Sequence, residues 1–193
     1  MRQQLKDIAD IRTGHTFRGK VPEDPKGNSR VLQIKDMRGK MVITSDTLTL
    51  INAKAINKTS HLEPDDVIIP ARGDHYNAAI FKPSDDSNTD VVASNQVLII
   101  RVNKSKIIPD YICWYLNQNE AKNYIKNEIR GTNIPMITKD SLSRLMIKIP
   151  PIEIQKKIVE LVNLWQKEKQ LTQKLMNNRE DMLKGMFQQL LEQ

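Results

Sequence analysis

Cysteine is almost missing from this chain of 193 residues, which holds only Cys113. A single thiol excludes an internal disulfide framework, and together with three scattered histidines it offers no zinc-ligand spacing. Cys113 lies between Ile112 and Trp114, so we expect a buried, apolar residue in a reducing compartment.

Long hydrophobic runs are missing as well. No apolar stretch approaches the roughly 20 residues that span a bilayer, and the first residues show no signal-peptide pattern. We therefore expect a cytoplasmic protein that does not enter a membrane.

Apolar residues make up 39% of the chain, and charged residues, which are spread along it, make up 27%. This composition favours one folded domain with an appendage.

Motifs of known catalytic sites are missing or misplaced. The chain has no phosphate-binding glycine loop, no nucleophile elbow and no glycine-rich turn for a methyl donor. Pro109-Asp110 and Glu120-Ala121-Lys122 match the letters of a nuclease pattern, but on one predicted helix the carboxylates stand about 15 Å apart. The segment 133–136 resembles an amino-methyltransferase loop without its stacking aromatic. We predict no catalytic site, no metal and no cofactor.

Positive charge is in surplus, at +7 for the whole chain. Residues 151–193 carry only +1, so residues 1–150 carry +6. A basic surface attracts polyanions, most often nucleic acid. The charge therefore makes residues 1–150 the candidate for DNA binding.

Short β-type runs dominate residues 1–150. They are uniformly apolar or alternating and are separated by Gly, Asn, Asp or Pro, which is typical of strands and turns. The predicted strands cover residues 31–34, 41–44, 47–51, 67–69, 78–81, 97–102 and 145–149. These runs predict an α+β protein whose first part is a mixed, largely antiparallel β domain.

Helical patterns surround these strands. Residues 5–12 form a short amphipathic element, and a helix is expected from Pro109 to Gly131. Thr138 is expected to cap a short helical turn over 138–141. After Pro150-Pro151 a long helix is predicted through residues 151–193, where Gly185 is the only glycine.

The predicted long helix would extend about 60 Å, more than a domain of this size needs to cover its own core. An apolar stripe with coiled-coil spacing runs along it, interrupted by Glu168, Thr172 and Arg179. We predict a dimer or partner interface on this helix; the alternative is a helix packed on its own domain. The interface candidates are Ile158, Trp165, Leu171, Leu175 and Met182.

Three basic loops provide the candidate DNA contacts. They cover residues 13–20, 35–40 and 71–77. Arg pairs with guanine and Asn with adenine in a major groove, while Lys and backbone N–H groups suit phosphates. A glycine in such a loop permits close approach to DNA. The candidates are Arg18, Lys20, Arg38, Arg72, Gly73, His75 and Asn77.

The order of these features resembles the specificity subunit of type I restriction-modification enzymes. The most specific part is Ile147-Lys-Ile-Pro-Pro-Ile-Glu-Ile-Gln155 with Ile158, ahead of the long helix. Further matches are Leu5–Ile8 with Gly14, 67–73, 93–98, 109–112 with Tyr115-Leu116, and Gly131-Thr132.

The resemblance implies a target-recognition domain at 1–150 and a helix at 151–193 for dimerisation and methyltransferase docking. In that family each recognition domain reads one half of a bipartite site in double-stranded DNA, without an active site of its own. The usual member has two recognition domains and two helices, whereas this chain has one of each. A homodimer, or pairing with a second half-subunit, is therefore expected, with a methyltransferase subunit and a restriction subunit as further partners. The alternative is a protein-interaction module of the same fold that does not bind DNA.

Overall fold

A computed structural model describes residues 1–52, 56, 58–84, 89–129 and 135–192. The chain divides into two compact units, Met1–Gln155 and Lys156–Gln193. The predicted helix end at Gly131 and residues 133 and 134 of the 133–136 loop lie outside the described residues. No helix within the described ranges is long and apolar enough to cross a membrane.

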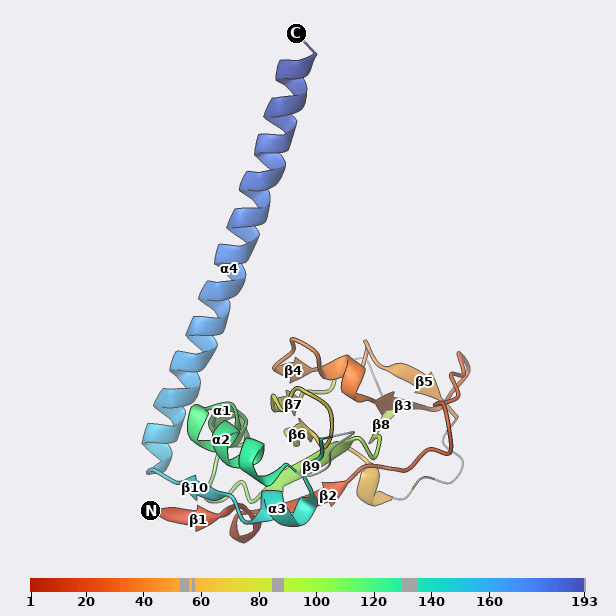
Figure 1. Ribbon diagram of the computed structural model, residues 1–193, viewed down its shortest axis with the longest axis vertical. Coiled ribbons are helices and arrows are strands. Elements are labelled where there is room, and N and C mark those ends of the chain that lie inside the picture. The colour runs from red at the N-terminus through yellow and green to blue at the C-terminus, as the bar shows by residue number, and fades with distance from the viewer. Residues whose placement is uncertain (53–55, 57, 85–88, 130–134, 193) are drawn as a thin grey trace. The chain divides into compact units, whose positions relative to one another are not determined.

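A five-stranded sheet in the order β2-β9-β6-β7-β4 forms the centre of the first unit (Figure 1). Its strands are β2 Ala9–Thr13, β4 Val42–Ile43, β6 Val67–Pro70, β7 Ala79–Phe81 and β9 Val97–Val102. Neighbours pair antiparallel, except β4 with β7. β6 and β7 are buried at every position, which explains why they read as continuous apolar runs rather than alternating ones.

Two smaller sheets complete the β structure. β3 Ser29–Leu32 lies between β5 Thr49–Ile51, its antiparallel neighbour, and β8 Asp90–Ala93, its parallel one. β1 Arg2–Gln4 pairs antiparallel with β10 Met146–Lys148. The short 3-10 helices are η1 Leu5–Asp7, η2 Ile34–Met37 and η3 Lys58–Ser60.

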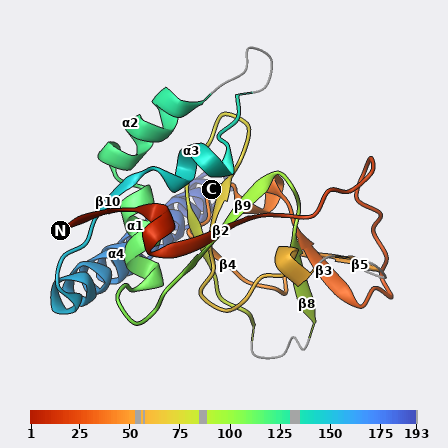
Figure 2. The same cartoon turned by 90° about the horizontal axis from the view of Figure 1, so that it is seen from below.

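The described residues of this unit include the helices α1 Pro109–Leu116, α2 Asn119–Glu128 and α3 Lys139–Ser143. Both ribbon views place α1 and α2 on one side of the five-stranded sheet and β3, β5 and β8 on the other (Figures 1 and 2). The mixed, largely antiparallel β domain is thus confirmed. The Thr138 cap is confirmed too, since its Oγ1 accepts a hydrogen bond from the Ser141 N–H at 3.0 Å.

Several local predictions were wrong. β8 was missed, the strand expected at 31–34 gives way at Ile34 to η2, and the element over 5–12 divides into η1 and β2. The helix expected from residue 109 breaks between α1 and α2, where Gln118 is extended (ψ 158°). At this break the Asn117 side chain bonds to the backbone of Ala78, an interaction that periodicity along the chain does not reveal.

The long helix α4 covers Ile152–Leu191, which is 40 residues, and confirms the predicted C-terminal helix. Its first turn is fixed by Gln155, whose side chain is fully buried. Gln155 Oε1 accepts from the Ile108 N–H at 2.9 Å, and Nε2 donates to the Pro150 carbonyl at 2.9 Å. This gives a physical reason for the glutamine that follows Pro150-Pro151.

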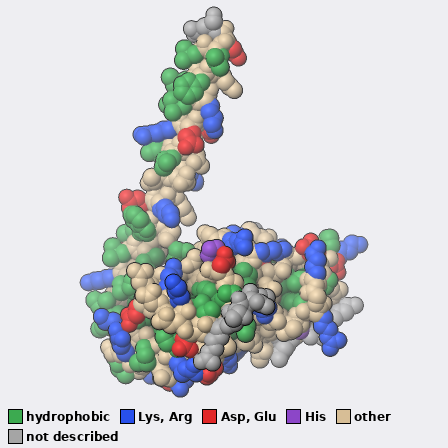
Figure 3. Space-filling view, viewed as in Figure 1, with side chains coloured by type: hydrophobic (Ala, Val, Ile, Leu, Met, Phe, Trp, Pro, Cys, Tyr) green, Lys and Arg blue, Asp and Glu red, His purple; other side chains and the backbone are tan. Residues whose placement is uncertain are grey.

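Large apolar side chains along the rest of α4 are exposed, and they recur along its length (Figure 3). Among the interface candidates, Trp165 is 61% exposed and Met182 58%. Ile158 is half-buried. Exposed side chains that the sequence reasoning did not name are Leu164, Met176, Leu183 and Phe187.

Candidate nucleic-acid interface

The three basic loops lie at the ends of strands, on one side of the five-stranded sheet. The register pairs Thr13 with Leu98 and Pro70 with Val97, so β2 and β6 end where β9 begins. β7 runs antiparallel to β6, and β4 runs parallel to β7, so both of these strands begin at the same edge. Residues 14–20, 35–41 and 71–78 therefore adjoin strand ends on the same side of the sheet, and we call this region the loop edge.

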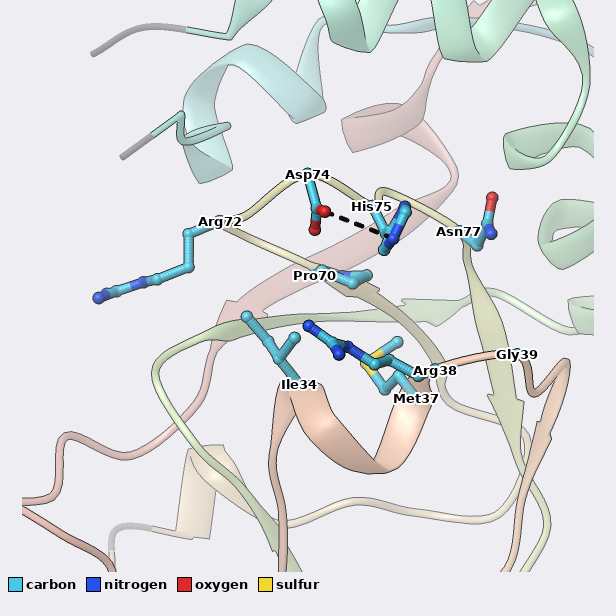
Figure 4. A pocket seen from close by; sticks show the side chains of 9 residues that line it. All are labelled: Ile34, Met37, Arg38, Gly39, Pro70, Arg72, Asp74, His75 and Asn77. Atoms are coloured by element: carbon cyan, nitrogen blue, oxygen red, sulfur yellow. Dashed lines mark ion pairs between the residues drawn. The ribbon is translucent and has the colours of Figure 1, made fainter. Parts of the chain in front are cut away.

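A cavity of about 330 Å³ opens between two of these loops (Figure 4). Arg38 and Gly39 line it from η2 and the turn that follows, and Asp74, His75 and Asn77 line it from the loop opposite. Its apolar lining is Ile34, Met37 and Pro70. Arg72 also lines the cavity, but its guanidinium extends away from the other side chains (Figure 4).

The 71–78 loop is held in place by hydrogen bonds to distant segments. The Gly73 N–H and the Tyr76 hydroxyl both donate to the Pro135 carbonyl, at 3.1 and 2.9 Å. At its end, the Ala78 N–H donates to Asn117 Oδ1 at 3.0 Å, and Asn117 Nδ2 donates to the Ala78 carbonyl at 2.9 Å. The loop therefore presents its side chains from a fixed backbone.

Gly73 is required by backbone geometry. Its φ of +103° lies in the left-handed region that side chains disfavour, and a Cβ there would meet no other atom within 4 Å. The space in front of Gly73 is therefore open. Close approach of this loop to DNA stays a prediction.

The predicted cations of the loop edge are available for a ligand. Within the described residues, no ion pair involves Arg18, Lys20, Arg38 or Arg72. Arg72 Nε also has no hydrogen-bond partner among the atoms described. His75 lies 3.5 Å from Asp74, and both side chains are exposed.

At the opposite ends of these strands, by contrast, the charged side chains pair with one another. Arg101 Nη2 lies 2.7 Å from Asp66 Oδ2, and Lys82 and Lys104 each lie 2.6 Å from an Asp65 oxygen. The hydrogen bonds from Lys104 and Lys82 lower the pKa of Asp65 below its usual value. Cations paired in this way have little left to offer a phosphate.

Arg18 and Lys20 belong to the loop edge but do not line the cavity. The loop that carries them is tied down at its start, where Gly14 lies so close to Ser94 that a Cβ would stand 2.1 Å from the Ser94 carbonyl oxygen. The His15 N–H donates to the Ala93 carbonyl at 2.7 Å. Beyond this anchor Arg18 and Lys20 are exposed.

Sequence reasoning missed two cations on α2. Lys122 and Lys126 line a second hollow of about 330 Å³, together with Ile125 and Ile129 and residues 74–77 of the loop. The signal was present, since lysines four apart share one face of a helix. It was overlooked because Lys122 was weighed only as part of a nuclease pattern.

The residues of that nuclease pattern are engaged separately. Asp110 lies on α1, 3.4 Å from Lys82 Nζ, whereas Glu120 lies on α2, 2.9 Å from an Arg2 nitrogen. The premise that both carboxylates share one helix was therefore wrong.

Burial raises the pKa of the Cys113 thiol to about 12, which leaves it unreactive at neutral pH. Across the described residues, no group of three His, Cys, Asp or Glu is placed to hold a metal.

Comparison with known proteins agrees with this architecture. Residues 2–178 match the model of the type I restriction modification DNA specificity domain. The type I restriction enzyme HindI specificity subunit of Haemophilus influenzae is 28% identical over 105 residues, which is 53% of this chain and 23% of that protein. The chain thus spans less than a quarter of that curated relative.

Solved structures show the same fold. The HsdS subunit from Thermoanaerobacter tengcongensis matches 87% of this chain and 37% of its own, with a TM-score of 0.63 and 18% identity. A chain from a study of assembly and conformational transition of the type I R-M system matches 87% of this chain and 38% of its own, with a TM-score of 0.65 and 18% identity. The family model covers most of the chain, and the chain therefore belongs to the type I restriction modification DNA specificity domain family.

Proposed function

We propose that residues 1–150 form a target-recognition domain that binds one half of a bipartite site in double-stranded DNA and performs no chemistry itself. Residues 151–193 form the second part, a helix for dimerisation and for docking a methyltransferase subunit. A restriction subunit joins the same complex. The chain acts as a homodimer or pairs with a second half-subunit.

The observation that carries the DNA-binding proposal is the convergence of unpaired cations at the loop edge. Arg38 and Arg72 come from different loops and both line one cavity. An arginine fork matches guanine O6 and N7, and the amide of Asn77 matches adenine N6 and N7. The exposed Arg18 and Lys20 are suited to phosphates beside the base contacts.

The helix proposal rests on length and exposure. At 1.5 Å per residue α4 extends about 60 Å. Two antiparallel copies would hold two recognition domains some tens of Å apart, and a two-fold dimer then reads an inverted repeat with a fixed spacer. The polar breaks at Glu168, Thr172 and Arg179 leave room beside the dimer seam for a methyltransferase subunit.

The test is a salt titration of binding to double-stranded DNA, combined with analytical ultracentrifugation. Phosphate contacts predict that log K falls with log salt by about 0.9 per neutralised phosphate. A flat salt profile would favour the alternative, in which the loop edge binds a protein. A strict monomer that selects one ungapped motif would refute the dimer.

A further inference from the structure

We infer that Lys122 and Lys126 of α2 form a phosphate clamp, which holds the DNA backbone beside the bases that the 71–78 loop contacts. This inference rests on the proposed DNA binding and adds a second contact region to it.

The first observation is the position of the two lysines. The hollow lined by Lys122 and Lys126 shares Asp74, His75 and Asn77 with the cavity of the loop edge.

The two hollows flank one loop. Residues 74–77 form the wall between them, with Arg38 on one side and the α2 lysines on the other. A groove-reading loop in DNA has a phosphate strand running beside it, because each groove is bounded by backbone. Cations next to the loop but outside its cavity therefore lie where a phosphate would pass.

The second observation is charge. Both lysines are exposed, and within the described residues neither forms an ion pair. The acidic side chains of α2 are used elsewhere, since Glu120 pairs with Arg2 and Glu128 with Arg144. Lysine is a flexible point charge, which suits a phosphate better than a base edge.

The third observation is rigidity. Asn117 stands between α1 and α2 and bonds both backbone groups of Ala78, so the start of α2 and the end of the loop are held together. Its Nδ2 also donates to the Cys113 carbonyl at 2.9 Å. The spacing between the lysines and the loop is therefore set by the fold, as a clamp requires.

The test uses the full chain and a labelled pool of random-sequence double-stranded DNA, titrated at a series of salt concentrations. We compare K122Q/K126Q with K6Q/K106Q, which removes two exposed lysines from the opposite edge of the sheet, and with R38A/R72A. The clamp predicts that K122Q/K126Q lowers the salt slope by about 1.8 and weakens binding equally for all sequences. K6Q/K106Q should leave the slope unchanged, and thermal melting should show all variants folded.

Sequence selection from the same pool separates the possible failures. K122Q/K126Q should keep the enriched motif of the unmodified chain, while R38A/R72A should lose it. If only R38A/R72A weakens binding, the clamp is refuted and the proposed function stands. An equal loss in K122Q/K126Q and K6Q/K106Q also refutes the clamp, because it shows a general charge effect. If the unmodified chain shows no salt-dependent binding, both proposals fail.

Discussion

At the scale of single residues, some charged side chains stabilise the fold through ion pairs, and we propose that others bind DNA. Arg101 belongs to the first group. Its Nε and Nη2 bond both oxygens of Asp66, at 2.8 and 2.7 Å. The Asp66 side chain is only 1% exposed, so water cannot replace this partner. Arg38 and Arg72 have no such partner among the described residues, and we propose that they contact DNA.

Replacing Arg101 should therefore destabilise the first unit. Arg101→Met leaves the Asp66 carboxylate buried without its counter-ion, which costs about 3–5 kcal/mol. Urea unfolding followed by circular dichroism measures the loss. Lys104→Met is the matched control, because Lys104 is 58% exposed and its ion pair contributes about 1 kcal/mol or less. Equal effects of the two substitutions would contradict the assignment.

Alkaline pH should destabilise the first unit through Tyr111. Burial raises the pKa of Tyr111 from 10.0 to about 12, and its hydroxyl donates to the Lys148 carbonyl at 2.5 Å. The folded state thus keeps its proton while the unfolded chain has lost it, so stability falls as the pH rises from about 10 to about 12. Cys113, with a pKa raised from 9.0 to about 12, acts in the same direction.

Unfolding free energies measured from pH 8 upward test this dependence. Tyr111→Phe cannot ionise at this position, so its stability should decline less steeply above pH 10 than that of the unmodified chain. Below pH 9 the two proteins should differ by a constant amount, the cost of the lost hydrogen bond. Parallel curves across the whole range would show that Tyr111 does not titrate in this way.

At the scale of elements, the break between α1 and α2 links the fold to the loop edge. Asn117→Ala removes the partners of the Ala78 N–H and carbonyl, and leaving the buried N–H unsatisfied costs about 1–3 kcal/mol. The 71–78 loop loses its anchor at Ala78, so base discrimination should weaken more than overall affinity for DNA. Gln118→Ala is the control, since the Gln118 side chain donates to the Trp114 carbonyl one turn earlier and does not contact the loop through that bond. Unchanged discrimination in Asn117→Ala would show that the anchor is not needed.

The sequence predicts those elements whose signal is local. The apolar runs of β6 and β9 and the Thr138 cap are examples, because burial and capping depend on neighbouring residues. The break at Asn117 was not predictable in this way, because the Asn117 side chain forms hydrogen bonds with Ala78, which is 39 residues away. The spacing of Lys122 and Lys126 places them on one helix face, but their position beside residues 74–77 exists only after folding. Gln155 stood in the recognised motif, but only the structure shows that it holds the Ile108 N–H.

At the scale of the whole molecule, the helix proposal makes Trp165 the most informative position. Trp165→Glu places a charge in the proposed seam, and since a central tryptophan in an interface is often worth 2 kcal/mol or more, the dimer should dissociate. Sedimentation velocity measures this directly. Asn163→Glu adds the same charge at an exposed polar position and should leave the dimer intact. A dimer unaffected by Trp165→Glu would show that Trp165 does not lie in the dimer interface.

The central claim is that the loop edge recognises DNA sequence, and selection from a random double-stranded DNA library tests it most directly. The unmodified chain, together with the methyltransferase subunit that we propose as its partner, should enrich an inverted repeat with a fixed spacer. Arg38→Ala with Arg72→Ala should abolish the preference at the positions these arginines contact, each worth about 1–3 kcal/mol of discrimination. Enrichment of the same motif to the same degree by both proteins, or no enrichment by either, would contradict the claim.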